Sequence, residues 1–234
     1  FGRLTVFVGG CTLEAAEEVC GANVDVLEAL ADKSLLHRRD DVPEPRFWML
    51  ESIGEFAAER LASSGGDQEL RTRHARYFRE FAARTNAEIR AGEPEEGPVA
   101  ALEAESNNLR AAAEFGLETG DLAVVREITA SLPMYWIVRG LYAEGRAWLE
   151  RALALGDAED DTQRRLLSAL GTITYAQGDH LAAVAASDEA ASLAARLGGA
   201  TDRLDLLKEQ ALAALRKEDF AAAEELFRER LDVA

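Results

Sequence analysis

Residues 170–183 read LGTITYAQGDHLAA, and this stretch decides the fold. A run of mostly helix-forming residues reaches Gly178, Asp179 follows, and small apolar residues resume directly afterwards. Glycine readily ends a helix, and aspartate is a preferred cap at the start of the next one. The stretch therefore predicts two helices joined by a tight turn, which together form an antiparallel hairpin.

The same arrangement recurs on both sides of this stretch. Gly140 lies 38 residues before Gly178, and Asp219 lies 40 residues after Asp179. The pattern resembles the tetratricopeptide repeat, with a longer period than the usual one of about 34 residues. A single hairpin of this kind cannot bury its apolar face, so neighbours must stack. Residues 99–234 are therefore expected to form a right-handed α-solenoid of tetratricopeptide-like hairpins.

Residues 1–62 have a different organisation, which predicts a winged-helix-like subdomain. Helices are expected up to residue 8, from Thr12 to Cys20, from Asp25 to Asp32, and from Ser52 onward. Residues 34–38 and 46–50 are strand-like and flank a turn with two prolines, so they predict a two-stranded hairpin. Residues 63–98 are expected to be a connecting helix, over 67–90, followed by a linker over 92–98. The predicted fold class is mainly α.

The charge balance limits the kinds of partner. The net charge is −17, and only residues 71–90, with six arginines and two glutamates, are basic. Such a field repels phosphate backbones, so no direct nucleic-acid contact is expected. No apolar run is long enough to span a membrane, and there is no signal peptide. A cytoplasmic location and no membrane partner are therefore expected.

Several stretches resemble, in order, the bacterial STAND-class regulatory ATPases, which include antibiotic-regulatory and LuxR-type transcription regulators. They lie at residues 4–17, 30–36, 46–57, 73–78, 105–112 and 145–153. The resemblance implies a winged helix and helical repeats that follow a nucleotide-binding domain. No phosphate-binding loop of the form Gly-x4-Gly-Lys-Ser/Thr occurs in these 234 residues. No cofactor is therefore expected here, and ATP is implied only for a neighbouring ATPase domain.

Residues that could carry chemistry have simpler interpretations. His74 lies on the apolar side of the 67–90 helix, where a histidine bonded to a core neighbour is expected. Tyr135 and Trp136 are expected to pack between hairpins. Two cysteines are too few for a zinc site, and the acidic loop at 157–161 lacks the spacing of a calcium loop. The arginine row of the 67–90 helix predicts a solvated face or an intramolecular dock. No enzyme activity is expected.

The candidate binding surface is the concave face of the repeats. Offsets of three and four place residues on one helical face, and the first helix of each hairpin is expected to line the concave side. An acidic peptide or carboxylate could bind there, although pairing with nearby acids is the simpler alternative. The ligand- or partner-binding candidates are Arg139, Arg165, Ser168, Thr172, Tyr175, Lys208 and Arg216.

These observations predict the regulatory and sensor fragment of a STAND-type ATPase transcription regulator. A protein or peptide partner, or a small-molecule inducer, would bind the repeats and control the protein's own ATPase and output domains. Two alternatives stay open. One is a free-standing tetratricopeptide interaction scaffold, and the other is the sensor arm of a signalling enzyme such as a cyclase or kinase.

Overall fold

The computed structural model describes residues 1–39, 44–63, 67–91, 96–156, 160–197 and 203–233. The chain is mainly helical, as predicted. It forms two compact units, residues 1–128 and 129–234. The predicted division at residues 62 and 98 is a finer one and stays a prediction.

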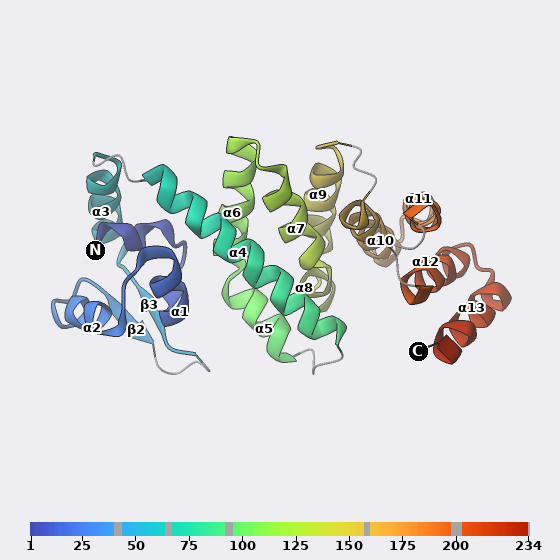
Figure 1. Ribbon diagram of the computed structural model, residues 1–234, viewed down its shortest axis with the longest axis horizontal. Helices are drawn as coiled ribbons and strands as arrows, with labels where there is room; N and C mark the ends of the chain where they lie inside the picture. The colour runs from blue at the N-terminus through green and yellow to red at the C-terminus, as the bar shows by residue number, and fades with distance from the viewer. Residues whose placement is uncertain (40–43, 64–66, 92–95, 157–159, 198–202, 234) are drawn as a thin grey trace. The chain divides into compact units, whose positions relative to one another are not determined.

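The first unit opens with short helices and a small sheet (Figure 1). The sheet is three-stranded and antiparallel, in the order β1-β3-β2. The predicted two-stranded hairpin was therefore incomplete, because Cys11 pairs with Phe47 and adds a third strand. The elements are the 3-10 helix η1 (Gly2–Val6), β1 (Cys11–Thr12), α1 (Leu13–Ala15), the π-helical turn η2 (Ala16–Cys20), α2 (Val24–Asp32), β2 (His37–Arg39) and β3 (Arg46–Trp48).

Local capping explains where the first helices begin. The Thr12 hydroxyl accepts a hydrogen bond from the Ala15 amide at 3.1 Å, so the predicted cap is confirmed. The start predicted at Asp25 was late by one residue, because α2 begins at Val24. The side chain of Asn23 accepts from the Val26 amide at 3.1 Å, and it is this residue that caps α2.

Longer helices complete the first unit. The long helix α4 packs against both α5 and α6 (Figure 1). The predicted linker over 92–98 was too long, because a helix already begins at Glu96; residues 92–95 lie outside the described part of the chain. Pro98 is tolerated because it falls in the first turn, where backbone amides lack helical partners. These helices are α3 (Glu51–Ser63), α4 (Asp67–Arg90), α5 (Glu96–Ala104) and α6 (Ser106–Thr119), and the first unit ends within α7 (Leu122–Ser131).

The second unit consists of helices that pack mainly against their neighbours in sequence. Gly178 has a positive φ of 79°, and the Asp179 side chain accepts from the Ala182 amide at 3.2 Å. The predicted turn between two helices is confirmed at this position. Gly171 permits close packing, since a Cβ there would lie 2.5 Å from the Ser187 hydroxyl. The helices are α8 (Pro133–Val138), α9 (Tyr142–Leu153), α10 (Asp161–Ala176), α11 (His180–Leu197), α12 (Arg203–Arg216) and α13 (Phe220–Val233).

Tyr135 and Trp136 of α8 pack in the core of this unit, as predicted. Trp136 is among the largest fully buried side chains, and Tyr135 is also buried. The acidic loop at 157–161 lies largely outside the described residues, but its Asp160 caps α10 by accepting from the Gln163 amide at 2.7 Å.

Candidate partner-binding surfaces

The seven residues predicted to line the concave face lie in different surroundings within the second unit. Arg165 of α10 donates to the Ala130 carbonyl oxygen at 3.3 Å and to the Ser131 hydroxyl at 3.5 Å. Tyr175 is exposed, and its ring meets the His180 ring edge-on at 5.3 Å between centroids. Lys208 is half-buried on α12, and Arg139 is exposed at the end of α8.

The remaining three residues of the set do come together. Arg216 of α12 reaches α10, where it donates to the Thr172 hydroxyl at 2.7 Å and to the Gly171 carbonyl oxygen at 3.1 Å. Thr172 in turn donates to the carbonyl oxygen of Ser168 at 3.0 Å. Burial lowers the pKa of Arg216, although the nearby charge of Glu209 opposes this. Arg216 therefore ties two helices together from a buried position.

A buried group of ion pairs in this unit, centred on Arg164, was not predicted from the sequence. Its guanidinium bonds to Asp161 at 2.6 Å, to Glu209 at 2.6 Å and to Asp205 at 3.1 Å. The side chains of Arg164 and Glu209 are each only 2% exposed. Burial alone would lower the pKa of Arg164, but the hydrogen bond to Asp161 and the three carboxylate charges raise it. The group stays charged and joins α10 to α12.

A second buried polar network holds the first unit together. Arg46 of β3 forms an ion pair with Glu105 and also donates to the Gly10 carbonyl oxygen at 3.2 Å. The Asn108 amide donates to Gly10 at 3.0 Å and to Glu105 at 2.7 Å, while its oxygen accepts from the Val8 amide at 2.7 Å. The sheet, the segment before β1 and α6 are thereby joined. Residues from three of the stretches that carry the family resemblance meet here.

His74 of α4 belongs to the edge of this network. Its Nε2 lies 3.3 Å from the Asn108 side-chain oxygen, and its ring packs 4.6 Å from that of Phe78. Burial lowers the pKa of His74 to about 4, although the hydrogen bond to Asn108 opposes the shift. The imidazole is neutral near pH 7 and donates from Nε2 to the amide oxygen. The prediction of a bonded core histidine is confirmed.

The cysteines show no sign of reactive chemistry. Cys11 and Cys20 are both buried and both free. Burial raises the pKa of the Cys11 thiol to about 12 and that of Cys20 to about 11, so little thiolate exists at neutral pH. Within the described residues no cluster of three or more histidine, cysteine or acidic side chains could hold a metal ion. The described helices also include none that is long and apolar enough to cross a membrane.

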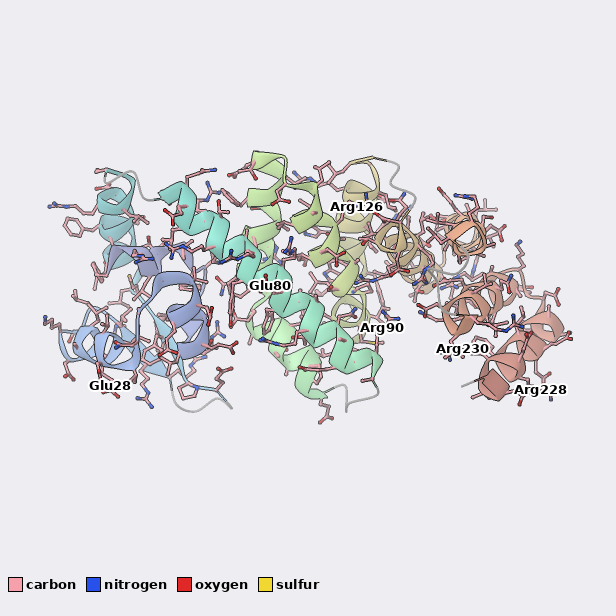
Figure 2. All side chains as sticks on the ribbon, viewed as in Figure 1. Glu28, Glu80, Arg90, Arg126, Arg228 and Arg230 are labelled. Atoms are coloured by element: carbon pink, nitrogen blue, oxygen red, sulfur yellow. The ribbon has the colours of Figure 1, made fainter. Side chains whose placement is uncertain are left out.

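The arginine row lies on α4, the helix that carries Glu80 and Arg90 in Figure 2. Several of these arginines form ion pairs with carboxylates. Arg71 binds Glu118 at 2.7 Å and lies over the Phe115 ring at 4.4 Å. Arg84 binds Glu14 at 3.4 Å, and Arg73 lies 3.7 Å from Glu69. Arg76 is exposed and Arg79 is half-buried. The paired members fit the predicted solvated face that neutralises nearby acids.

The first unit also contains a groove that sequence reasoning did not predict. It has a volume of about 350 Å³ and is bounded by η1, β3 and the start of α3. Its walls are mainly apolar and include Leu4, Phe47 and Trp48, and two carboxylates, Glu51 and Glu55, stand among its lining residues. At its edge Gly10 has φ +92°, and a Cβ there would lie 2.5 Å from the Phe47 carbonyl oxygen. Glycine is therefore required at position 10.

Comparison with known proteins gives relatives over part of their length. One from Mycobacterium bovis and two from Mycobacterium tuberculosis each carry the name "Putative HTH-type transcriptional regulator". Each is 32% identical to this chain over 160 residues, which is 65% of this chain and 18% of the relative. The chain thus spans less than a fifth of the length of these relatives. No family profile and no solved structure matches it.

Proposed function

We propose that this chain is the regulatory and sensor portion of a bacterial, cytoplasmic transcription regulator of the STAND type. In this proposal residues 1–62 form a winged helix that couples to an ATPase domain elsewhere in the protein. Residues 99–234 form tetratricopeptide-like hairpins that bind a protein, a peptide or a small inducer. The chain itself contacts neither nucleotide nor DNA, and it is not an enzyme.

The observation that carries the proposal is the similarity over 160 residues to proteins named as HTH-type transcriptional regulators. Because that match covers 18% of each relative, the DNA-binding part of such a protein has ample room outside the matched region. The net charge of −17 agrees with a DNA-binding part outside this chain, because an acidic surface repels phosphate backbones. The buried network of Arg46, Glu105 and Asn108 supports a coupling role, since it joins the sheet to α6.

The second candidate function is a free-standing interaction scaffold. The stacked helices of the second unit favour it. The complete open reading frame distinguishes it from the leading proposal. A regulator of the STAND type requires a phosphate-binding loop, Gly-x4-Gly-Lys-Ser/Thr, encoded upstream of Phe1, and a DNA-binding domain elsewhere. A frame without that loop contradicts the ATPase assignment and leaves the scaffold. A cyclase or kinase domain in place of the DNA-binding domain contradicts the transcriptional role.

A further inference from the structure

We propose that the groove beside α3 binds a protein segment that presents a bulky apolar side chain next to lysine or arginine. The inference rests on the proposed role as an interaction module and names the chemistry of one partner. It concerns residues of the first unit only.

The groove offers an apolar floor to a side chain. Leu4, Phe7, Phe47 and Trp48 line it, and Leu50 at its edge is 49% exposed. A volume of about 350 Å³ exceeds that of any single side chain, so an anchor residue and its neighbours fit. Burying such an anchor in an apolar pocket is how most tight peptide contacts are made.

The rim of the groove is acidic. Glu51 and Glu55 line it, and Glu59 continues the same face of α3 one turn further on. All three side chains are exposed, and among the described residues none of the three carboxylates forms an ion pair. Like charges at four-residue spacing repel one another, so a cation bound between them would relieve an unfavourable arrangement.

The rest of α3 strengthens the choice of partner. Phe56 is 55% exposed, and the guanidinium of Arg60 lies over its ring at 5.2 Å rather than beside the glutamates. An acidic, partly apolar helix repels nucleic-acid backbones and anionic membranes alike. Charge complementarity therefore favours a basic, apolar polypeptide segment.

A position within the groove allows a clean steric test. Gly54 lies in α3 and lines the groove, and a Cβ added there meets no atom within 4 Å. Gly54→Phe should fill the groove without displacing the backbone. Gly97 of α5 also has open space around it, so Gly97→Phe is the matched control.

The experiment is a selection of 16-residue random peptides displayed on phage against the 234-residue chain, with counter-selection on Gly54→Phe. Enriched sequences should pair a bulky apolar residue with nearby lysine or arginine. Synthetic versions should bind Gly54→Phe at least tenfold more weakly than the parent chain, and Gly97→Phe equally well. Circular dichroism and thermal melting verify that both variants fold.

Charge variants test the rim. The triple variant Glu51→Gln, Glu55→Gln, Glu59→Gln should lose at least tenfold in affinity for the selected peptides. The control triple Glu18→Gln, Glu80→Gln, Glu88→Gln removes the same charge from exposed sites elsewhere and should change affinity less than twofold. Equal losses in both triples, enrichment of sequences without basic residues, or no enrichment would each overturn the proposal. Self-association that Gly54→Phe abolishes would assign the groove to a second copy and overturn it too. None of these outcomes bears on the reading-frame test of the proposed function.

Discussion

The side-chain amide of Asn108 donates a hydrogen bond to the carbonyl oxygen of Gly10 at 3.0 Å, across 98 positions of sequence. The same amide holds Glu105, and the Asn108 oxygen accepts from the backbone of Val8. One buried side chain thus satisfies polar groups from two distant segments. Such groups are costly when left unpaired, so the contact specifies how these segments pack.

Asn108→Ala should destabilise the first unit markedly. The substitution leaves part of the buried Glu105 carboxylate and the partly buried Val8 amide without partners. We expect a loss of about 2–3 kcal/mol in the free energy of unfolding, measured by urea titration. Asn107→Ala at the exposed neighbouring position should cost less than about 0.5 kcal/mol. Equal effects of the two substitutions would show that the network is not what stabilises the unit.

Glu209→Ala should destabilise the second unit, because it leaves Arg164 charged and buried without its best-sequestered partner. Removing one member of a buried ion pair typically costs about 3–5 kcal/mol. The exposed pair Lys217–Asp188 is the control, and Asp188→Ala should cost at most about 1 kcal/mol. The double variant Arg164→Met, Glu209→Leu should recover most of the loss, since no unpaired partner of this pair then remains. A double variant as unstable as Glu209→Ala would contradict this explanation.

The folded chain should lose stability as the pH drops, over a range set by the pKa of His74. Its pKa in the folded chain is about 4, against an ordinary value of 6.5. The unfolded chain therefore binds a proton between these values that the folded chain excludes. The contribution is complete above pH 6.5 and declines as the pH falls to about 4, by up to about 3 kcal/mol.

The comparison of stability at pH 7 and pH 4.5 isolates this effect. In His74→Gln the difference between the two pH values should be smaller than in the parent chain by about 2 kcal/mol or more. His180→Gln replaces an exposed histidine and should keep the parent's difference. A His74→Gln variant with an unchanged pH dependence would show that burial of this imidazole does not control it.

Two substitutions test the predicted concave face, with thermal melting to verify that the variant, which loses the Arg165 bonds to Ala130 and Ser131, still folds. Arg165→Ala with Lys208→Ala removes two cations at partly buried positions of α10 and α12. Partner binding should weaken by about 1–3 kcal/mol, as measured by calorimetry with an acidic peptide or inducer that binds the parent chain. Arg216→Ala should instead lower stability, because Arg216 bonds to Gly171 and Thr172. An acidic ligand that binds the double variant as tightly as the parent would exclude this face.

Local signals in the sequence predicted most helix positions. Gly178 adopts a positive φ and the Asp179 side chain accepts from the Ala182 amide, so the turn depends on local contacts alone. Thr12 caps a helix through the same kind of local bond, from the Ala15 amide. The third strand was missed because β1 has only two residues, Cys11 and Thr12, too few to show an alternating pattern. Its pairing with Phe47 depends on a contact between distant segments.

The site was harder to predict than the fold. Arg165 was predicted to line the concave face. Its neighbour Arg164 is the arginine that forms the ion pair with Glu209. Helical periodicity leaves such neighbours unresolved when almost the whole surface of α10 is covered. The groove beside α3 combines η1, β3 and α3, so no single stretch of sequence reveals it.

In the proposed function, the repeats hold the ATPase domain of a longer regulator inactive until a partner binds. The rate of ATP hydrolysis is measured for the full-length protein and for a version that lacks residues 133–234, which removes the second compact unit from α8 onward and keeps α7 whole. Coupling energies of about 1–3 kcal/mol between sites correspond to changes of about 5- to 150-fold. We predict that removal of this unit raises the rate at least about fivefold. A folded truncated protein that hydrolyses ATP at the same rate as the full-length protein, or more slowly, would show that the repeats do not restrain the ATPase domain.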